Sequence, residues 1–244
     1  SSNPELSEII NKKPKIVLLN KCDVADENAT KMWISYYKNN NITALPVDCR
    51  TGKGLNQFIP ACKQVLKNVI EKNEAKGMAG KSLRFMVIGI PNTGKSSFIN
   101  RMAGKNKTVV ADRAGVTRSN QWFNVGNGIE LLDTPGVLWP KFDDPTVGDK
   151  LAFIGSIKDE VMDMESLSCR LLDVLKKTNP QMIENRYKIS DFENLEGWEI
   201  LEMIGRKRGF LIKGGEINYE RTANIICDEF RGGKLGRISL ELPL

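Results

Sequence analysis

A segment in the middle of the chain carries the residues with the most specific chemistry. Residues 89–96 read GIPNTGKS and fit the pattern G-x-x-x-x-G-K-[ST], in which backbone N–H groups surround phosphate oxygens. Lys95 is placed to reach the β- and γ-phosphates, and the hydroxyl of Ser96 to bind Mg²⁺. A glycine-rich turn with a chance Lys-Ser pair is the alternative, but an apolar run at residues 83–88 and a helical stretch at 97–102 flank the segment as a phosphate loop requires. We assign nucleotide binding to six consecutive residues: Asn92, Thr93, Gly94, Lys95, Ser96 and Ser97.

Two further polar segments follow this loop and offer oxygen atoms for Mg²⁺. Asp133 begins the motif DTPG directly after the apolar run IELL, where its carboxylate can hold the shell of the metal ion. The backbone N–H of Gly136, which ends the motif, can sense a γ-phosphate. Thr117 lies between the two motifs in the polar stretch AGVTRS and would supply a hydroxyl from a switching loop. We therefore predict Lys95 and Thr117 as catalytic residues, with Ser96 and Thr117 as Mg²⁺ ligands.

Two motifs that precede the phosphate loop fit a guanine base. In NKCD, which begins at Asn20, the carboxylate of Asp23 can accept hydrogen bonds from N1–H and from the 2-amino group, and the stem of Lys21 can pack along the ring. In DCRTG, the loop that begins at Asp48 brings the backbone N–H of Cys49 near guanine O6. Adenine lacks the two donors that an aspartate would bind, so the sequence predicts selectivity for GTP over ATP.

The order of these motifs along the chain is informative. NKCD and DCRTG come before the phosphate loop, AGVT and DTPG, whereas in ordinary GTPases the phosphate loop comes first. In this order, and in DTPGVLWPKF (133–142) and GGEINYERTANIICDEFRGGKLGRISLE (214–241), the sequence resembles the circularly permuted GTPases, most closely bacterial members that assemble the large ribosomal subunit. The resemblance implies a GTPase that is slow alone and stimulated by the ribosome, with GTP or GDP and Mg²⁺ as ligands. It also implies late maturation of the large subunit, with the GTP state coupled to rRNA binding through the C-terminal domain.

Apolar runs and helical spacing indicate the elements that must position these motifs. Strands are predicted over residues 15–19, 42–47, 83–88 and 129–132, and helices over 25–40, 55–72, 164–177, 195–205 and 219–230. We expect an α/β P-loop GTPase domain with a mostly parallel sheet and helices on both faces, and a smaller, mainly α-helical C-terminal domain. The predicted division lies between residues 1–155 and 156–244.

Histidine is absent from the 244 residues, which excludes any mechanism that uses an imidazole of this sequence. Ras-like GTPases carry glutamine after the DxxG glycine, but that position is Val137, which cannot hydrogen-bond a water. The resemblance implies a catalytic histidine further upstream and an additional strand there, so we expect the N-terminal part of the domain to lie outside this sequence. Asn92 matches the asparagine that holds K⁺ in potassium-activated GTPases, and Arg113 and Arg118 are alternative sources of positive charge.

The net charge of +6 is unevenly distributed, with +7 up to residue 160 and −1 after it. Residues 63–118 hold twelve Lys or Arg against three acids, a pattern that suits a solvated face and nucleic-acid binding equally well. Two basic clusters in the C-terminal region, RKR at 206–208 and RGGKLGR at 231–237, fit an RNA backbone.

The five cysteines are widely spaced without a CxxC pair, which indicates reduced thiols in a cytoplasmic protein and no zinc site. No apolar run is long enough to span a membrane. We expect a cytoplasmic monomer that makes no membrane contact.

Two other classes of function remain open at this point. A P-loop small-molecule kinase would share GxxxxGKS but would not need NKCD, and competition between guanine and adenine nucleotides separates the two. An RNA-binding scaffold with a purely structural nucleotide is the other alternative, and measurable turnover that is lost on substitution of Lys95 would exclude it.

Overall fold

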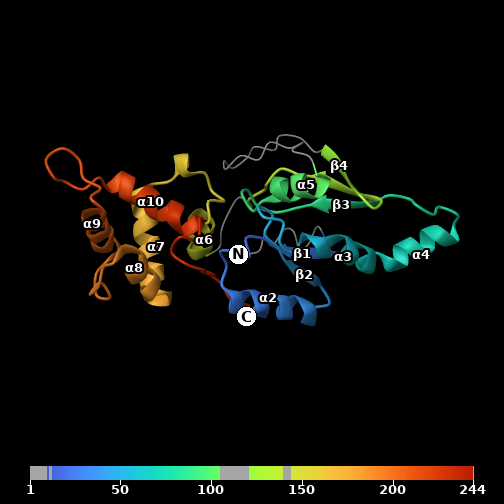
Figure 1. The fold of residues 1–244 in the computed structure, drawn as a ribbon, viewed down its shortest axis with the longest axis horizontal. Coiled ribbons are helices and arrows are strands. Elements are labelled where there is room, and N and C mark those ends of the chain that lie inside the picture. The colour runs from blue at the N-terminus through green and yellow to red at the C-terminus, as the bar shows by residue number, and fades with distance from the viewer. Residues whose placement is uncertain (1–9, 11–12, 105–120, 140–143, 244) are drawn as a thin grey trace. The chain divides into compact units, whose positions relative to one another are not determined.

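The computed structural model describes residues 10, 13–104, 121–139 and 144–243. They group into two compact units. The GTPase-motif unit comprises Ser2–Pro140 and Glu241–Leu244, and the helical unit comprises Lys141–Leu240. Both are drawn in Figure 1, and each is described by itself below.

The described strands of the GTPase-motif unit form two sheets. Strand β1 (Ile16–Leu19) pairs in parallel with β2 (Thr43–Pro46). Strand β3 (Leu83–Val87) pairs in parallel with β5 (Ile129–Asp133), and β4 (Gln121–Gly126) runs antiparallel on the other side of β5. The four predicted strands are thus confirmed within one or two residues. Among the described residues, β1 and β3 each pair with a strand on one side only.

The helices of this unit alternate with its strands. They are α2 (Glu27–Asn39), the 3₁₀ turn η1 (Leu55–Gln57), α3 (Phe58–Val65), α4 (Lys67–Ala75) and α5 (Lys95–Ala103). The side chain of Asp26 caps α2 by accepting a hydrogen bond from the N–H of Ala29 at 2.7 Å. The single helix predicted over 55–72 is interrupted at Leu66, whose backbone leaves helical geometry at φ −101°, ψ 15°.

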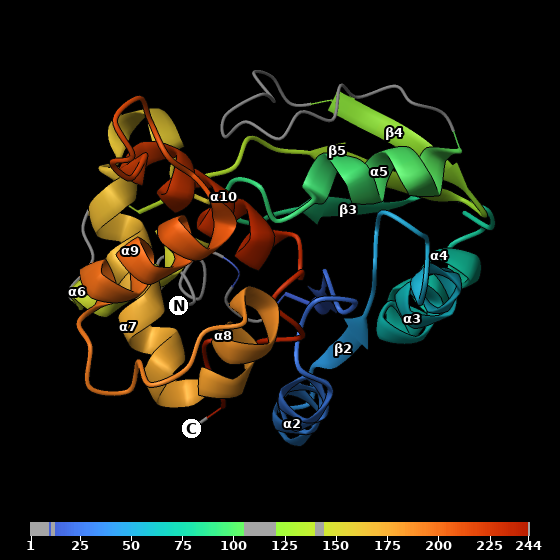
Figure 2. The ribbon, with the colours of Figure 1, turned by 60° about the vertical axis from the view of Figure 1, so that its left-hand side comes forward.

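Aromatic side chains join the two sheets in one hydrophobic core. Phe58 of α3 lies edge-to-face with Phe98 of α5, with ring centroids 4.9 Å apart, and 6.2 Å from the ring of Phe85 on β3. Helix α5 covers one face of the β3–β5–β4 sheet, as Figure 2 shows, and buries Phe123 and Leu131 beneath it. This shared core fixes the ends of β1, β2, β3 and β5, where the motifs begin.

The helical unit contains five α-helices among its described residues. They are α6 (Pro145–Phe153), α7 (Met164–Thr178), α8 (Pro180–Tyr187), α9 (Gly197–Arg208) and α10 (Tyr219–Arg231), with a 3₁₀ turn η2 at Asp159–Val161. Leu171, Leu172 and Leu175 of α7 are fully buried against the helices around it. The mainly helical character predicted for the C-terminal region is confirmed for the described residues.

Three elements were not predicted from the sequence: β4, α6 and α8. Leu151, Ala152 and Phe153 of α6 are buried, and α6 packs with the later helices. For this reason the contacts group α6 with the helical unit, whereas the sequence division at residues 155 and 156 would separate it from that unit. No described helix has the length and apolar character needed to cross a membrane.

Candidate functional site

The side-chain amide of Asn20 connects three of the motif loops. Its Nδ2 donates to the carbonyl of Thr93 in the phosphate loop at 2.7 Å, and its Oδ1 accepts from the N–H of Cys49 at 3.1 Å. A Cβ at Gly94 would lie 2.2 Å from Nδ2, so only glycine allows this approach. The motifs NKCD, DCRTG and GIPNTGKS, spread over 77 positions from residue 20 to residue 96, therefore meet at one place, as the sequence predicts.

The backbone of the phosphate loop turns tightly at Asn92 and Gly94. Asn92 and Gly94 both have positive φ, +57° and +91°, which lets successive N–H groups turn toward one side. The hydroxyl of Thr93 donates to the carbonyl of Ile90 at 2.9 Å and closes the loop. Helix α5 begins at Lys95, so the loop leads directly into the helix N-terminus. Ser96 and Ser97 lie in the first turn of this helix.

The ammonium group of Lys95 lies inside the loop. Its Nζ donates to the carbonyls of Gly89 and Ile90 at 3.0 and 2.9 Å. Burial lowers the pKa of Lys95, and the nearby carboxylate of Asp133 opposes that shift. Burial costs this cation part of its hydration, the two carbonyls and Asp133 offset that cost in part, and an anion bound in the loop would offset it further.

Ser96 and Asp133 bring two hard oxygen donors together. The Oγ of Ser96 lies 3.4 Å from Oδ2 of Asp133, and the carboxylate of Asp133 is almost completely buried at the end of β5. The hydroxyl of the next residue, Thr134, donates to the carbonyl of Val87 at 2.7 Å and holds the DTPG motif against β3. A hydroxyl and a carboxylate at this spacing suit Mg²⁺, which prefers oxygen ligands and retains waters.

Gly136 also approaches the phosphate loop closely. A Cβ on Gly136 would lie 2.7 Å from the backbone nitrogen of Pro91 and 3.0 Å from Nζ of Lys95. The two motifs predicted to surround the γ-phosphate are therefore in contact, and a side chain at position 136 would push them apart.

The second base loop is held by Asp48. Its carboxylate accepts from the N–H of Arg50 at 2.8 Å and from the hydroxyl of Thr51 at 2.6 Å. Burial alone would raise the pKa of Asp48, but the hydrogen bonds from Thr51 and Arg50, together with the charge of Arg50, lower it. Asp48 thus shapes the loop, and the N–H of Cys49 is the group that the loop presents. Burial raises the pKa of the Cys49 thiol to about 12 and keeps it neutral.

Asp23 is more exposed than Asp48 and forms an ion pair. Its Oδ2 lies 3.2 Å from Nη2 of Arg50, a largely exposed side chain of the second base loop. This pair places the predicted guanine-binding carboxylate beside the loop that carries Cys49. The preceding Lys21 has a φ of +57°, a left-handed backbone conformation that turns the chain directly after Asn20.

Arg101 belongs to no sequence motif and was not predicted as part of the site. This residue lies on α5, and its guanidinium donates to the carbonyl of Thr51 and packs under Gly52, where a Cβ would lie 3.0 Å from Nε. Arg101 thereby links the helix of the phosphate loop to the second base loop. No motif marks it, since the contact joins residues 50 positions apart.

Three of the residues named from the sequence, Thr117, Arg113 and Arg118, lie outside the described residues. Val137, at the position of the Ras glutamine, is 59% exposed. Apart from Thr117, every residue to which we assigned nucleotide or metal binding lies on a loop or helix end of the cluster or, as with Asp133, at the end of a strand that leads into it.

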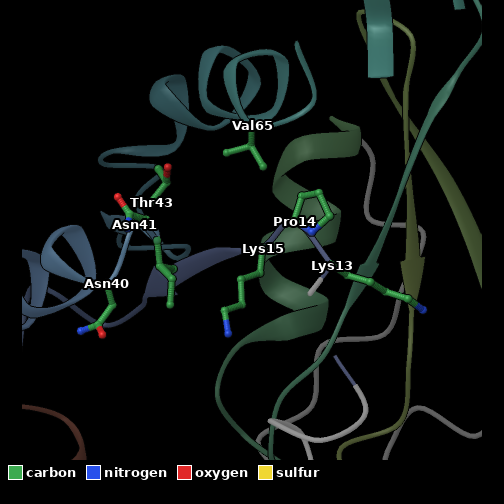
Figure 3. A pocket seen from close by; sticks show the side chains of 8 residues that line it. Lys13, Pro14, Lys15, Asn40, Asn41, Thr43 and Val65 are labelled. Atoms are coloured by element: carbon green, nitrogen blue, oxygen red, sulfur yellow. The ribbon is translucent and has the colours of Figure 1, made fainter. Parts of the chain in front are cut away.

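A cavity of about 430 Å³ opens at the other end of β1 and β2, lined by residues 13–15, residues 40–43 and Val65. Figure 3 shows Lys13 and Lys15 extending in different directions from Pro14. Because the nucleotide motifs all follow the carboxyl ends of strands, this cavity at the amino ends is separate from the candidate site.

Part of the sequence matches a known protein family. Residues 84–198 match the family described as "50S ribosome-binding GTPase". The match begins at β3, just before the phosphate loop, and includes DTPG but not NKCD or DCRTG, which lie earlier in this chain. This agrees with the permuted motif order.

Full-length relatives and solved structures point the same way. Proteins named "Ribosome biogenesis GTPase A" from Bacillus cereus and Priestia megaterium are 41% and 43% identical over all of this chain and 82% and 84% of their own lengths. A namesake from Thermotoga maritima is 32% identical over 95% of this chain and 78% of its own length. The structure titled "GDP-bound structue of TM YlqF" superposes with a TM-score of 0.66 at 30% identity, covering 96% of this chain and 85% of its own. The GNP-bound YlqF from T. maritima gives 0.61 at 29% identity, with 96% and 84% covered. This chain therefore belongs to the ribosome biogenesis GTPase A family and is a GTPase with a role in ribosome assembly.

Proposed function

We propose that this protein acts in late maturation of the large ribosomal subunit, with its GTP state coupled to rRNA binding through the helical unit. Nucleotide binding is supported most directly by the position of Asn20. Its side chain joins the phosphate loop to the loop that presents the N–H of Cys49. A ligand that has both a guanine base and phosphates would contact both loops and tighten this junction. The names of the family and of its relatives support the ribosomal part.

Guanine recognition rests on Asp23. Its carboxylate would accept from N1–H and the 2-amino group of the base, while the N–H of Cys49 would donate to O6. Binding would require Asp23 to rotate away from Arg50 or to share its oxygens with that side chain, and the exposure of Arg50 leaves room for both. Adenine offers neither donor, so ATP would leave a carboxylate without its partners.

Hydrolysis would rest on positioning and on charge, as phosphoryl transfer requires. Lys95 would exchange its two loop carbonyls for β- and γ-phosphate oxygens, and the N–H of Gly136 would contact the γ-phosphate. Ser96 and Thr117 would ligate Mg²⁺, and Asp133 would help to hold its shell. When bound, the ion would supply positive charge against the charge that develops on the phosphates.

A monovalent cation would complete the positive charge. Asn92 lies in the phosphate loop with a left-handed backbone, and its side chain would hold K⁺ near the phosphates. Val137 cannot orient a water, so we expect slow turnover by the chain alone and stimulation by the ribosome. Arg113 and Arg118 stay as alternative sources of charge. Replacing K⁺ by Na⁺ at constant ionic strength, with and without Asn92→Ala, tests this assignment.

The path from nucleotide to the helical unit would be short. DTPG ends at Gly136, and only residues 137–144 separate it from α6, the first helix of the helical unit. Loss of the γ-phosphate would release Gly136 and change the course of this connection. We propose this covalent path as the coupling between the GTP state and the affinity for rRNA.

The basic clusters of the helical unit are only partly available for RNA. The guanidinium of Arg231 is bound to Asp159 at 2.7 Å and to the carbonyls of Ala152 and Phe153 at 2.9 Å each, so it stabilises the fold. Arg206 pairs with Glu202 on the same helix. Lys207 and Lys234 are therefore the residues that we propose for phosphate contacts.

One binding experiment tests the coupling. Full-length protein loaded with a non-hydrolysable GTP analogue or with GDP is sedimented with large ribosomal subunits at several salt concentrations. We expect tighter binding with the analogue and a steep loss of affinity with salt. The double variant Lys207→Gln/Lys234→Gln should reduce the salt dependence, while Lys76→Gln, an exposed lysine of the other unit, should not. Equal binding in both nucleotide states would contradict the proposal.

A further inference from the structure

The helical unit contains a groove whose lining includes two aromatic side chains and one carboxylate. It has a volume of about 550 Å³ and is lined by residues of α7, α9 and α10: Glu165, Ser166, Cys169, Arg170, Trp198, Leu201 and Tyr219. Trp198 and Tyr219 are the first residues of their helices that lie outside the core, and they are 56% and 38% exposed. We call this cavity the α7–α9 groove. None of the nucleotide motifs contributes to it.

The close approach of two helices places Trp198 at the groove. Gly197, the first residue of α9, lies against the backbone of α7, where a Cβ would be 2.2 Å from the carbonyl oxygen of Cys169. A larger residue at position 197 would separate the helices. The next residue, Trp198, is exposed at the surface. Leu201, one turn later, is buried and forms the floor.

Within the described ranges, no arginine lies over either aromatic ring of the groove. Three guanidinium groups of the described residues lie over aromatic rings, at Trp122, Tyr187 and Phe210. None lies over Trp198 or Tyr219. Two of these contacts, at Tyr187 and Phe210, lie in the helical unit, and the two rings of the groove could make the same kind of contact with a ligand.

Three carboxylates act on the groove: Glu165 belongs to its lining, and the charges of Asp163 and Asp173 reach Cys169. Arg170 is the one cationic side chain among the described residues of the lining, and its Nε binds Asp149 at 3.0 Å. Glu165 forms no ion pair with another described residue. Burial raises the pKa of the Cys169 thiol, and the charges of Asp173, Glu165 and Asp163 raise it further, so three carboxylates act on the floor of the groove.

We propose that the α7–α9 groove binds a lysine or arginine side chain from a basic, extended protein segment. The cationic group would lie against Trp198 and Tyr219 and pair with Glu165, while its aliphatic stem would cover Leu201. An RNA strand fits less well, because Asp163 and Glu165 would repel its phosphates. Lys207, which we propose for RNA phosphate contacts, lies about 14 Å from Trp198 along the same helix. This partner is separate from the nucleotide and RNA sites of the proposed function.

The test uses the full chain, a fluorescently labelled hexa-arginine peptide, a neutral Gly-Ser peptide of the same length and a single-stranded oligouridine. Polarisation should show binding of hexa-arginine and none of the neutral peptide. Trp198→Ala should weaken that binding about 10-fold and Glu165→Gln about 3-fold. Trp122→Ala, an exposed tryptophan of the other unit that already carries Arg84, serves as the matched control and should leave it within about 2-fold.

Three outcomes would overturn the proposal. The first is hexa-arginine binding that is unchanged in both Trp198→Ala and Glu165→Gln. The second is equal binding of the neutral peptide. The third is oligouridine binding that is lost in Trp198→Ala, which would make the groove an RNA surface. GTP binding, measured in parallel, should be unchanged in both groove variants, and this separates a failure of the groove from a failure of the nucleotide site.

Discussion

The amide of Asn20 donates to the carbonyl of Thr93 across 2.7 Å, although 73 residues separate the two in sequence. Because the other end of the same amide accepts from Cys49, one side chain holds the base-binding and phosphate-binding parts of the site in register. An amide suits this position because it donates at one atom and accepts at the other. A carboxylate of the same shape could serve Cys49 but not Thr93.

Replacing Asn20 should therefore weaken nucleotide binding without unfolding the protein. We expect Asn20→Asp to lose about 10-fold to 100-fold in affinity for GTP and GDP alike, as fits the loss of one partly buried hydrogen bond beside a new charge. Titration of a fluorescent guanine nucleotide measures this. Asn40→Ala is the matched control, since the exposed Asn40 amide donates to the carbonyl of Tyr36 and no described residue of the nucleotide motifs contacts it. This variant should bind guanine nucleotides as the wild type does. Wild-type affinity in Asn20→Asp would show that the junction is not needed.

Arg101 should act as a positioning residue for the base loop. It contacts Thr51 and Gly52 and would touch neither base nor phosphate, so we expect Arg101→Ala to reduce the preference for GTP over ATP by about 5-fold to 10-fold. Competition binding with the two nucleotides gives this ratio. Arg101→Lys should keep part of the preference for GTP that Arg101→Ala loses. Arg84→Ala, which removes an exposed arginine paired with Glu130, should leave the ratio unchanged. An equal loss of GTP and ATP affinity in Arg101→Ala would indicate a general structural defect instead.

Asp48 should make the stability of the GTPase-motif unit depend on pH. Its pKa in the folded protein is lowered from 3.8, so folding favours the ionised carboxylate. The stabilisation is fully present above pH 3.8 and is lost as the pH falls through the lowered value. We expect Asp48→Asn to lower the free energy of unfolding by about 1 to 3 kcal/mol at pH 7 and by less at pH 3. Urea unfolding at both pH values checks this, and a difference that is the same at both would contradict it.

Lys95 should lower the free energy of unfolding of the nucleotide-free protein. Burial lowers its pKa, so the charged form is disfavoured in the folded protein, and the stability of the free protein should rise as the pH increases through that lowered pKa. Lys95→Met should keep or raise the free energy of unfolding at neutral pH, by up to about 1 kcal/mol. The same variant should no longer gain thermal stability from GTP and Mg²⁺. Thermal melts with and without nucleotide measure both effects. A Lys95→Met protein that is less stable than the wild type without nucleotide would contradict the expected cost of burying the Lys95 charge.

Most of the site could be predicted from the sequence because its chemistry lies in contiguous motifs. GIPNTGKS, NKCD, DCRTG and DTPG each follow an apolar strand, and loops that follow parallel strands meet at one edge. Arg101 could not be predicted, because its partner is a backbone carbonyl in a distant loop. The sequence predicts the loop that begins at Asp48, but it does not predict that the Asp48 carboxylate accepts hydrogen bonds from within that loop.

The missed elements have local reasons. Strand β4 reads QWFNVG, in which Trp122 is exposed and Phe123 buried, and so lacks the continuous apolar run by which the other strands were identified. Helices α6 and α8 are short and begin with proline at their first position, where its fixed φ suits a helix start but reads as a break in a sequence. Apolar residues keep helical spacing through α3 and α4, so the spacing alone does not predict the break between these helices at Leu66.

The most direct test of the whole account is GTP turnover by the full chain, measured with and without large ribosomal subunits, in K⁺ and in Na⁺. We predict slow turnover alone, a clear stimulation by the large subunit in K⁺, a smaller one in Na⁺, and no stimulation in Lys95→Ala or Ser96→Ala. Turnover that is unaffected by the large subunit in either salt would contradict the proposal that the nucleotide site is coupled to the ribosome.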